Sequence, residues 1–186
     1  FCIKKLAAIT GGAEWVLASI SSGLVARGHE VHIITFDHES ETSFHPISEH
    51  VHLHKIGQIE KSLFSEFKQY LNLRNLVLSL KPKIVFGFLP SIYVVLSLIF
   101  FLNNFRFVAC EHISREWYKG HIIKYALVCL AGNISDRITF LSADIAASFN
   151  HILPKKKLVM GNPVRKMTKL ADVMGGRKKR YTILNV

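Results

Sequence analysis

The sequence predicts an α/β fold built on a doubly wound parallel sheet. Apolar runs of strand length alternate with helical stretches along most of the 186 residues. Residues 31–36 are rich in β-branched side chains, as in a strand, whereas the apolar residues after position 13 recur at helical spacing. Strand–helix–strand units of this kind give parallel sheets with right-handed crossovers. An apolar content of 49% excludes a disordered chain.

The first strand–helix–strand unit occupies residues 1–36. Residues 1–3 are typical of the end of a strand, and Gly11 and Gly12 permit a tight turn after it. The helix that follows ends at Gly28, a residue type favoured just after a helix. Its apolar stripe consists of Val16, Leu17, Ile20, Leu24 and Val25.

The same alternation continues to residue 160. Strands are expected at 51–56, 84–89, 105–110, 138–142 and 158–160. Helices are expected at 62–80, 91–102, 117–130 and 143–149. The most apolar stretch, 92–102, is shorter than the roughly 20 residues that span a bilayer, so we interpret it as a buried helix. These elements form one domain over residues 1–163.

The chain changes character after this domain. Residues 164–180 are basic and poor in large apolar side chains, as in a linker, and residues 181–186 again have a strand pattern. We therefore expect the first strand of a second domain at 181–186. The sequence begins without a methionine and ends at this strand, so we expect further sequence at both ends.

The formal charge of +11 is concentrated near the C-terminus. Residues 1–154 carry 14 basic and 12 acidic side chains, whereas 155–186 carry 10 basic and one acidic. A nucleic-acid-binding domain more often spreads its basic surface over the folded body. A solvated charged segment is the first interpretation, an anionic membrane surface the second and nucleic acid the third. The three cysteines form no motif and lie in apolar runs, which indicates buried thiols in a cytosolic protein.

The first candidate site is the glycine turn at Gly11 and Gly12. Ligands of open parallel sheets bind at the carboxyl ends of the strands, and the following helix directs its positive dipole end there. A phosphate suits both features, although a tight turn without a ligand explains the glycines equally well. The spacing matches neither the dinucleotide-binding fingerprint nor a P-loop, which disfavours a nicotinamide cofactor.

The second candidate site follows the strand at 105–110. Glu111, His112, Ser114 and Arg115 form a polar and titratable cluster at its carboxyl end. A histidine in this place has the chemistry to hydrogen-bond a substrate hydroxyl or to transfer a proton. The alternative is a loop histidine with a purely structural hydrogen bond.

A third group of residues suggests zinc only weakly. His45, His50, His52 and His54 are close in sequence, and the last three would share one face of a strand. Zinc binds such side chains, but no cysteine or carboxylate is placed to complete a tetrahedral site. We therefore expect a polar strand face and no metal site.

The glycine turn and its helix resemble the start of family 4 glycosyltransferases. Gly11-Gly-Ala-Glu-Trp-Val-Leu17 and Gly23-Leu-Val-Ala-Arg-Gly-His-Glu-Val31 are similar to the family pattern G-G-A-E-R-V-L followed by G-L-x-x-R-G-H-E-V. The resemblance extends through residues 111–112, 136–142 and 159–164. Trp15 departs from it, because the family usually has arginine after the glutamate.

This resemblance implies the N-terminal half of a GT-B fold, in which two Rossmann-like domains face each other across a cleft. In the family the N-terminal domain mostly binds the acceptor, and the C-terminal domain binds the nucleotide-sugar donor; transfer is retaining and uses no metal or cofactor. By resemblance, Gly11 and Gly12 would lie against the donor diphosphate and His112 would face the donor sugar as the catalytic residue. The candidates for acceptor binding are Glu14, Glu111, Ser114 and Arg115.

The resemblance also implies a function for the chain. We expect the acceptor-binding domain of a retaining hexosyltransferase in cell-surface polysaccharide, lipopolysaccharide or glycolipid synthesis, which alone transfers no sugar. Its partners would be a nucleotide sugar and a glycan or lipid-linked acceptor, without nucleic acid. The alternatives are a GT-B-fold nucleotide-sugar epimerase, disfavoured by the G-G-A-E opening, and a non-catalytic membrane- or nucleic-acid-binding module, disfavoured by the polar strand ends.

A cytoplasmic protein with peripheral contact to the inner face of the plasma membrane is expected from the helix at 117–130. Lys119 and Lys124 would meet anionic headgroups, while Trp117, Tyr118 and Ile122 reach the interface. Residues 155–157 would add basic charge if they lie on the same side. In the alternative, the apolar residues of this helix pack on the sheet: Ile122, Ile123, Leu127 and Leu130.

Overall fold

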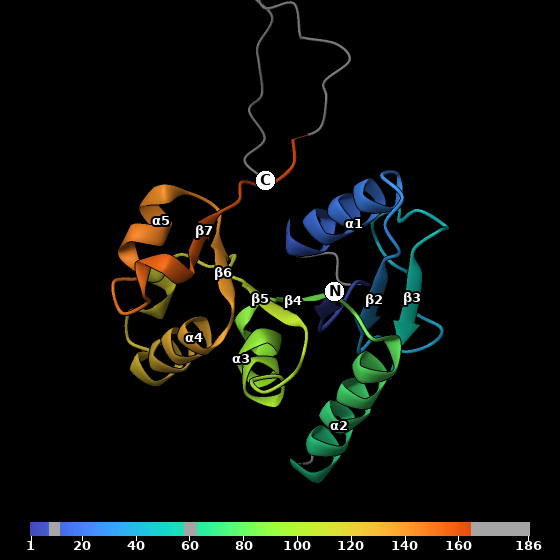
Figure 1. The fold of residues 1–186 in the computed structure, drawn as a ribbon, viewed down its shortest axis with the longest axis horizontal. Coiled ribbons are helices and arrows are strands. Elements are labelled where there is room, and N and C mark those ends of the chain that lie inside the picture. Colours follow the sequence, from blue (N-terminus) through green and yellow to red (C-terminus); the bar gives the residue numbers. More distant parts are fainter. Residues whose placement is uncertain (8–11, 58–62, 165–186) are drawn as a thin grey trace, which may run out of the picture.

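The computed structural model describes residues 1–7, 12–57 and 63–164 of the chain. Its strands form one seven-stranded sheet in the order β3-β2-β1-β4-β5-β6-β7, and every neighbouring pair is parallel (Figure 1). The strands are β1 (Cys2–Ile3), β2 (His32–Thr35), β3 (His52–Lys55), β4 (Ile84–Phe88), β5 (Arg106–Cys110), β6 (Arg137–Phe140) and β7 (Lys157–Val159). This confirms the predicted doubly wound α/β fold.

Helices cover both faces of the sheet. Helix α1 (Gly12–Val25) lies on one face, and α2, α3 and α4 lie on the other (Figure 1). The remaining helical segments have the bounds α2 (Leu63–Leu80), α3 (Pro90–Ile99), η1 (Arg115–Tyr118), α4 (Ile122–Ile134), α5 (Ala143–Ser148) and η2 (Pro154–Lys156). The chain therefore winds in both directions from β1, as the sequence pattern predicts.

The core is divided into two apolar layers by the central strands. Successive residues of a strand point to opposite faces, so Ile33 packs in the layer under α1 while Ile34 packs in the layer under the other helices. Burial on both faces explains why the central strands are continuous apolar runs. The three cysteines are free and buried, and burial raises the pKa of Cys110 to about 12.

One predicted helix is divided in the structure. The expected helix at 117–130 is instead the short 3₁₀ helix η1 followed by α4. Gly120 lies between them with a φ of 84°, a left-handed conformation that ends the first segment. His121 then precedes a helix that extends to Ile134. Aromatic and apolar spacing hides this break, because Gly120 is a single residue in an otherwise helical pattern.

The rest of the sequence lies outside the described residues. The expected linker from residue 165 onward and the expected strand at 181–186 belong to this part, so the predicted domain boundaries stay predictions. Within the described residues, no helix has the length and apolar character needed to cross a membrane.

Candidate functional site

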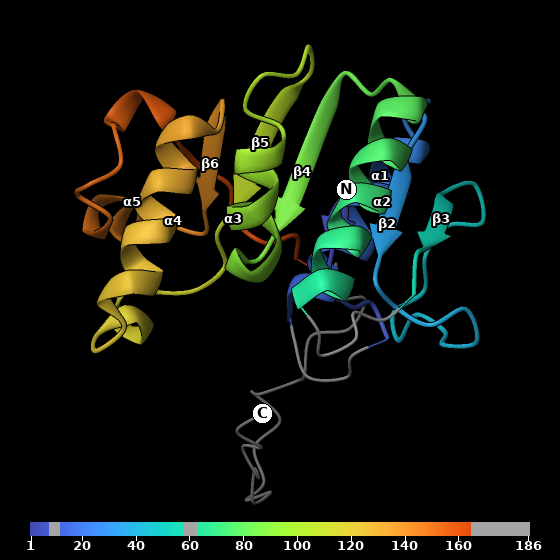
Figure 2. The same ribbon diagram turned by 90° about the horizontal axis from the view of Figure 1, so that it is seen from below.

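The candidate site lies at the carboxyl edge of the sheet. Connections run to one side from β1 through α1 and to the other side from β4 through α3, so the winding direction changes between β1 and β4. Ligands of open α/β sheets bind in the crevice at such a switch point. The strands end at the edge where α1 begins (Figure 2). Gly12, after β1, and His112, after β5, both belong to this edge.

His112 offers an unused polar atom at this edge. Its ring stacks on Phe88, the last residue of β4, with centroids 5.1 Å apart and 23° between the planes. Its Nε2 is buried and has no hydrogen-bond partner among the described residues. Burial lowers the pKa of His112, so the imidazole is neutral near pH 7. A buried, unpaired ring nitrogen is costly unless something binds it, which favours a ligand contact over the purely structural alternative.

Glu111 holds the same loop from inside the protein. It is 1% exposed, and its Oε2 accepts hydrogen bonds from the hydroxyls of Tyr93 (2.5 Å) and Tyr118 (2.8 Å). Its Oε1 accepts from the backbone N–H of Ile113 at 2.8 Å. Because the carboxylate of Glu111 is buried, the expectation that it contacts the acceptor directly does not fit this geometry. We infer instead that Glu111 positions His112, its neighbour in the loop.

The electrostatics of this buried group explain why it needs several donors. Burial raises the pKa of Glu111, although the hydrogen bonds from Tyr93, Ile113 and Tyr118 act in the opposite direction. Burial, followed by the nearby Glu111 charge, raises the pKa of both tyrosine hydroxyls. The tyrosines therefore stay protonated and act as donors to the carboxyl group.

The start of α1 forms the other side of the candidate site. Gly11 lies outside the described residues, but Gly12 opens α1, and a Cβ placed on it would meet nothing within 4 Å. Glu14 is buried in the first turn, and its Oε2 has no partner in the part of the chain that the structure describes. The helix start thus combines open space, backbone N–H groups and an unsatisfied carboxylate oxygen.

Ser114 and Arg115 lie at the beginning of η1. Ser114 is exposed and precedes the 3₁₀ helix. The guanidinium of Arg115 lies over the ring of Tyr125, 4.0 Å from its centroid, and its Nε has no hydrogen-bond partner among the described residues. This cation–π contact holds the guanidinium over the ring while its Nε–H stays available to a ligand.

Sequence reasoning missed a buried carboxylate beside the segment that follows β1. Asp37 follows β2 and is 1% exposed. Its Oδ2 accepts hydrogen bonds from the backbone N–H of Leu6 and the hydroxyl of Thr35, both at 2.7 Å. It thus holds the backbone at Leu6, three residues after the end of β1. A lone acid directly after an apolar strand is the only sequence feature that marks it.

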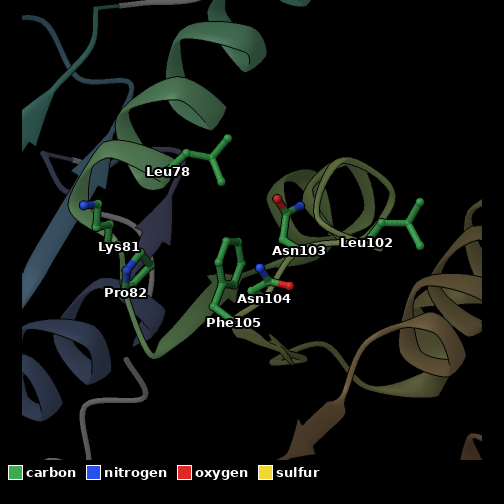
Figure 3. Close-up of a pocket in the computed structure, with 7 residues that line it drawn as sticks. All are labelled: Leu78, Lys81, Pro82, Leu102, Asn103, Asn104 and Phe105. Carbon is green, nitrogen blue, oxygen red and sulfur yellow. The ribbon is translucent and has the colours of Figure 1, made fainter.

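A hollow at the amino edge of the sheet, opposite the candidate site, has few side chains suited to catalysis. It lies between the end of α2 and the loop after α3 (Figure 3). Its lining consists of Leu78, Lys81, Pro82, Leu102, Asn103, Asn104 and Phe105. These residues include one titratable side chain, Lys81, and lie away from the switch point. The carboxyl edge therefore remains the candidate site.

The fold matches one half of solved glycosyltransferase structures. The structure resembles Anabaena Alr3699/HepE in complex with UDP (TM-score 0.66, 13% identity) and with UDP and glucose (0.64, 12%), each over 88% of this chain. It also resembles WaaG, a glycosyltransferase involved in lipopolysaccharide biosynthesis (0.58, 15%, 86% of this chain). The chain spans 43–44% of the length of these proteins.

The family follows from the sequence match. Residues 10–164 match the model of Glycosyltransferase Family 4, and the chain belongs to that family. This confirms the resemblance seen at the glycine turn. Among curated proteins, no sequence matches the chain.

Proposed function

We propose that this chain is the acceptor-binding half of a retaining glycosyltransferase that uses a nucleotide sugar. The observation that carries the proposal is the unpaired, buried Nε2 of His112 at the switch-point edge of a family 4 domain. The similar HepE structures bind UDP and glucose, which supports a nucleotide-sugar donor. The donor-binding half would come from sequence beyond the part matched here, so residues 1–186 alone would not transfer sugar.

The start of α1 would stabilise the leaving diphosphate. Gly12 leaves room for phosphate oxygens, and the first N–H groups of the helix lack partners within the helix. Negative charge grows on the diphosphate as the glycosidic bond to the donor breaks. Fixed N–H dipoles that face this charge lower the transition-state energy without reorganisation.

His112 would hydrogen-bond the donor sugar through its Nε2. The ring is held by Phe88 before the substrate arrives, and the loop is held by Glu111. A neutral imidazole suits a contact to a sugar hydroxyl, since it adds no charge that would compete with the diphosphate. Glu14, Ser114 and Arg115 would bind hydroxyl or acidic groups of the acceptor.

The acceptor would belong to a cell-surface polysaccharide, lipopolysaccharide or glycolipid. The likeness to WaaG supports this class, and so does an exposed apolar surface on α4. Ile122 and Ile123 are 80% and 78% exposed, and Leu127 and Leu130 continue the same surface. The exposure of these four side chains supports this surface over the alternative in which they pack on the sheet.

The α4 surface has the composition of a membrane contact. Exposed Lys119 and Lys124 flank the apolar residues, and the Nζ of Lys124 lies 5.1 Å from the ring centroid of Trp117. Apolar and aromatic side chains edged by lysines suit an anionic bilayer surface. Tyr118, by contrast, is buried and cannot reach the interface as expected.

The basic residues at 155–157 contribute less than expected. The Nζ of Lys156 donates to the carbonyl of Ser135, and that of Lys157 donates to the carbonyl of Ala146, both at 2.7 Å. Only Lys155 of the three is exposed. The membrane contact would therefore depend on Lys119 and Lys124.

Sugar transfer by a two-domain enzyme that contains this chain tests the proposal. The assay would offer UDP-glucose first and then other nucleotide sugars, with lipid-linked and free glycan acceptors. We expect nucleotide release that depends on the acceptor, with retention at the anomeric carbon by NMR. Inversion would contradict the retaining mechanism, and interconversion of nucleotide sugars without an acceptor would favour the epimerase alternative.

A further inference from the structure

A histidine cluster lies at the amino ends of β2 and β3, on the edge opposite the candidate site. His32 and His52 begin the two strands and face each other in register. Their rings stack with centroids 4.7 Å apart, and the ring of His54 stacks on His32 at 5.2 Å. His50, expected on the same face, lies instead in the turn before β3, with its Nε2 3.9 Å from Glu49. The cluster therefore joins residues from two strands.

The structure brings a carboxylate to this cluster. The Oε1 of Glu30 lies 3.1 Å from the Nε2 of His32. One ligand atom from each of Glu30, His32 and His52 lies within 4.8 Å of the others. Ligand atoms around a tetrahedral zinc ion are separated by about 3.4 Å. The Glu30 side chain is 75% exposed and His52 is also exposed, so rotation of these two side chains can close the difference and turn the His52 ring out of its stack on His32 without moving the backbone.

We propose that Glu30, His32 and His52 form a site for a divalent late transition-metal cation such as Zn²⁺. Two imidazoles and one carboxylate are a donor set that zinc prefers, and the exposed position leaves a fourth place to water. Oxygen-seeking Mg²⁺ suits it poorly. Because β3 is an edge strand, an ion bound by His52 of β3 and His32 of β2 would hold the two strands together.

His54 would orient the metal-binding ring. Its Nε2 lies 3.0 Å from the Nδ1 of His32, on the side of the ring away from Glu30. The two distances fit neutral rings in which Nε2–H of His32 donates to Glu30 and Nε2–H of His54 donates to Nδ1 of His32. When a cation binds Nε2 of His32, the proton of that ring has to sit on Nδ1. His32 then donates a hydrogen bond from Nδ1 to Nε2 of His54. His54 in turn carries its own proton on Nδ1. The number of protons is unchanged, and the histidine ligand gains the hydrogen-bonded partner typical of metal sites.

Other groups in the described residues compete little for the ion. The free cysteines are buried, so they offer no accessible thiolate. The Glu30, His32 and His52 set is the only group of three or more such side chains with this geometry in that part of the chain. Sequence spacing could not reveal it, because twenty residues separate the two histidine ligands.

Titration calorimetry of the tag-free 186-residue chain with ZnCl₂ tests the site. We expect one bound Zn²⁺ per chain and no heat from MgCl₂. His52→Gln changes an exposed side chain and His32→Asn a half-buried one, and each should weaken Zn²⁺ binding at least tenfold. His54→Phe keeps the ring but removes the acceptor, which should cost 10- to 100-fold in metal affinity. His50→Gln is the matched control and should bind like the wild type.

Each outcome of these experiments either supports the metal site or overturns it. Thermal unfolding in EDTA shows whether each variant is folded, and folded His52→Gln suffices for the decision if His32→Asn unfolds. Tenfold weaker binding in the folded ligand variants, with an unaffected His50→Gln, supports the site. No Zn²⁺ binding by the wild type, unchanged affinity in His52→Gln or an equal loss in His50→Gln would overturn it. None of these measurements depends on sugar transfer.

Discussion

The imidazole of His112 stacks on the phenyl ring of Phe88, with the ring centroids 5.1 Å apart. Phe88 ends β4 and is fully buried, and His112 follows β5, so two neighbouring strands fix the orientation of one ring. The ring loses its rotational freedom when the protein folds and not when a ligand binds. Its Nε2 therefore has a fixed position at the sheet edge, which is what preorganised catalysis requires.

The first prediction concerns the activity of His112→Ala. In the two-domain enzyme that contains this chain, we expect kcat to fall about 100-fold or more, because a contact to the reacting sugar is lost. Steady-state kinetics with a saturating donor measure the effect. His29→Ala, an exposed histidine outside the candidate site, is the control and should retain wild-type kcat. A His112→Ala enzyme with wild-type kcat would remove this residue from the catalytic machinery.

The second prediction concerns pH. Burial lowers the pKa of His112 in the folded chain, whereas the unfolded chain keeps a value of about 6.5. Between these two values the unfolded state binds more protons, so the free energy of unfolding falls as the pH drops through 6.5. His112→Gln removes this contribution, and urea unfolding at pH 7.5, 6.5 and 5.5 should show a shallower decline. The half-buried His54 has a pKa lowered in the same direction and leaves a residual slope. A decline as steep as in the wild type would contradict the prediction.

The sequence predicted the sheet because its central strands are buried on both faces. Ile33 and Ile34 pack into opposite layers, so two adjacent residues of β2 are both apolar. The break at Gly120 was missed because it depends on one left-handed residue. Local composition therefore predicted the layers well and the ends of the helices less well.

For the candidate site, the sequence predicted the strand that precedes Glu111 but not the contacts of the residues that follow it. Glu111 and His112 could be located from the strand that precedes them. The partners of Glu111, however, come from 18 residues before it and 7 residues after it, and nothing in the local pattern links Tyr93 or Tyr118 to a carboxylate. The same holds for Asp37, whose bond to the N–H of Leu6 joins residues 31 positions apart. Such contacts arise only when the sheet assembles.

The third prediction concerns the two tyrosines that bind Glu111. Tyr93→Phe and Tyr118→Phe each remove one hydroxyl from a buried carboxyl group, and we expect each to lower the free energy of unfolding by about 1–3 kcal/mol. Urea unfolding measures the change. Tyr70→Phe is the control, because its hydroxyl makes an exposed hydrogen bond to the carbonyl of Ser91, and its effect should be within about 0.5 kcal/mol. Equal stability of Tyr93→Phe and the wild type would contradict the proposed network.

The fourth prediction compares two glycines. A Cβ on Gly87 would lie 2.8 Å from the Cβ and 3.1 Å from the Cα of Tyr93, so Gly87→Ala must push β4 away from α3. We expect a loss of about 1–3 kcal/mol in the free energy of unfolding. Gly12→Ala meets open space and should change stability by less than about 0.5 kcal/mol. In the two-domain enzyme, however, Gly12→Ala should raise KM for the donor, because its methyl group would occupy diphosphate space. An unchanged KM would show that Gly12 does not contact the donor.

The last prediction concerns the exposed surface of α4. Ile122, Ile123, Leu127 and Leu130 turn outward, so the chain exposes apolar side chains beside two lysines. Each basic residue near an anionic membrane contributes about 1 kcal/mol, so Lys119 and Lys124 together account for roughly a 30-fold change in partitioning. This attraction weakens as salt shortens the screening length. We therefore expect the chain to bind anionic vesicles at low salt more strongly than neutral vesicles.

Co-sedimentation with phosphatidylserine-containing and pure phosphatidylcholine vesicles measures this binding. Lys119→Glu with Lys124→Glu should lower the partition coefficient for anionic vesicles roughly 30-fold or more, since repulsion replaces attraction. Lys81→Glu with Lys83→Glu makes the same change in net charge at the end of α2 and the start of β4, away from α4, and should have a smaller effect. Ile123→Ser with Leu127→Ser should weaken binding to both kinds of vesicle, because apolar insertion is lost. If the two charge-reversal pairs reduce binding equally, net charge alone explains the attraction and α4 is not the membrane-facing surface.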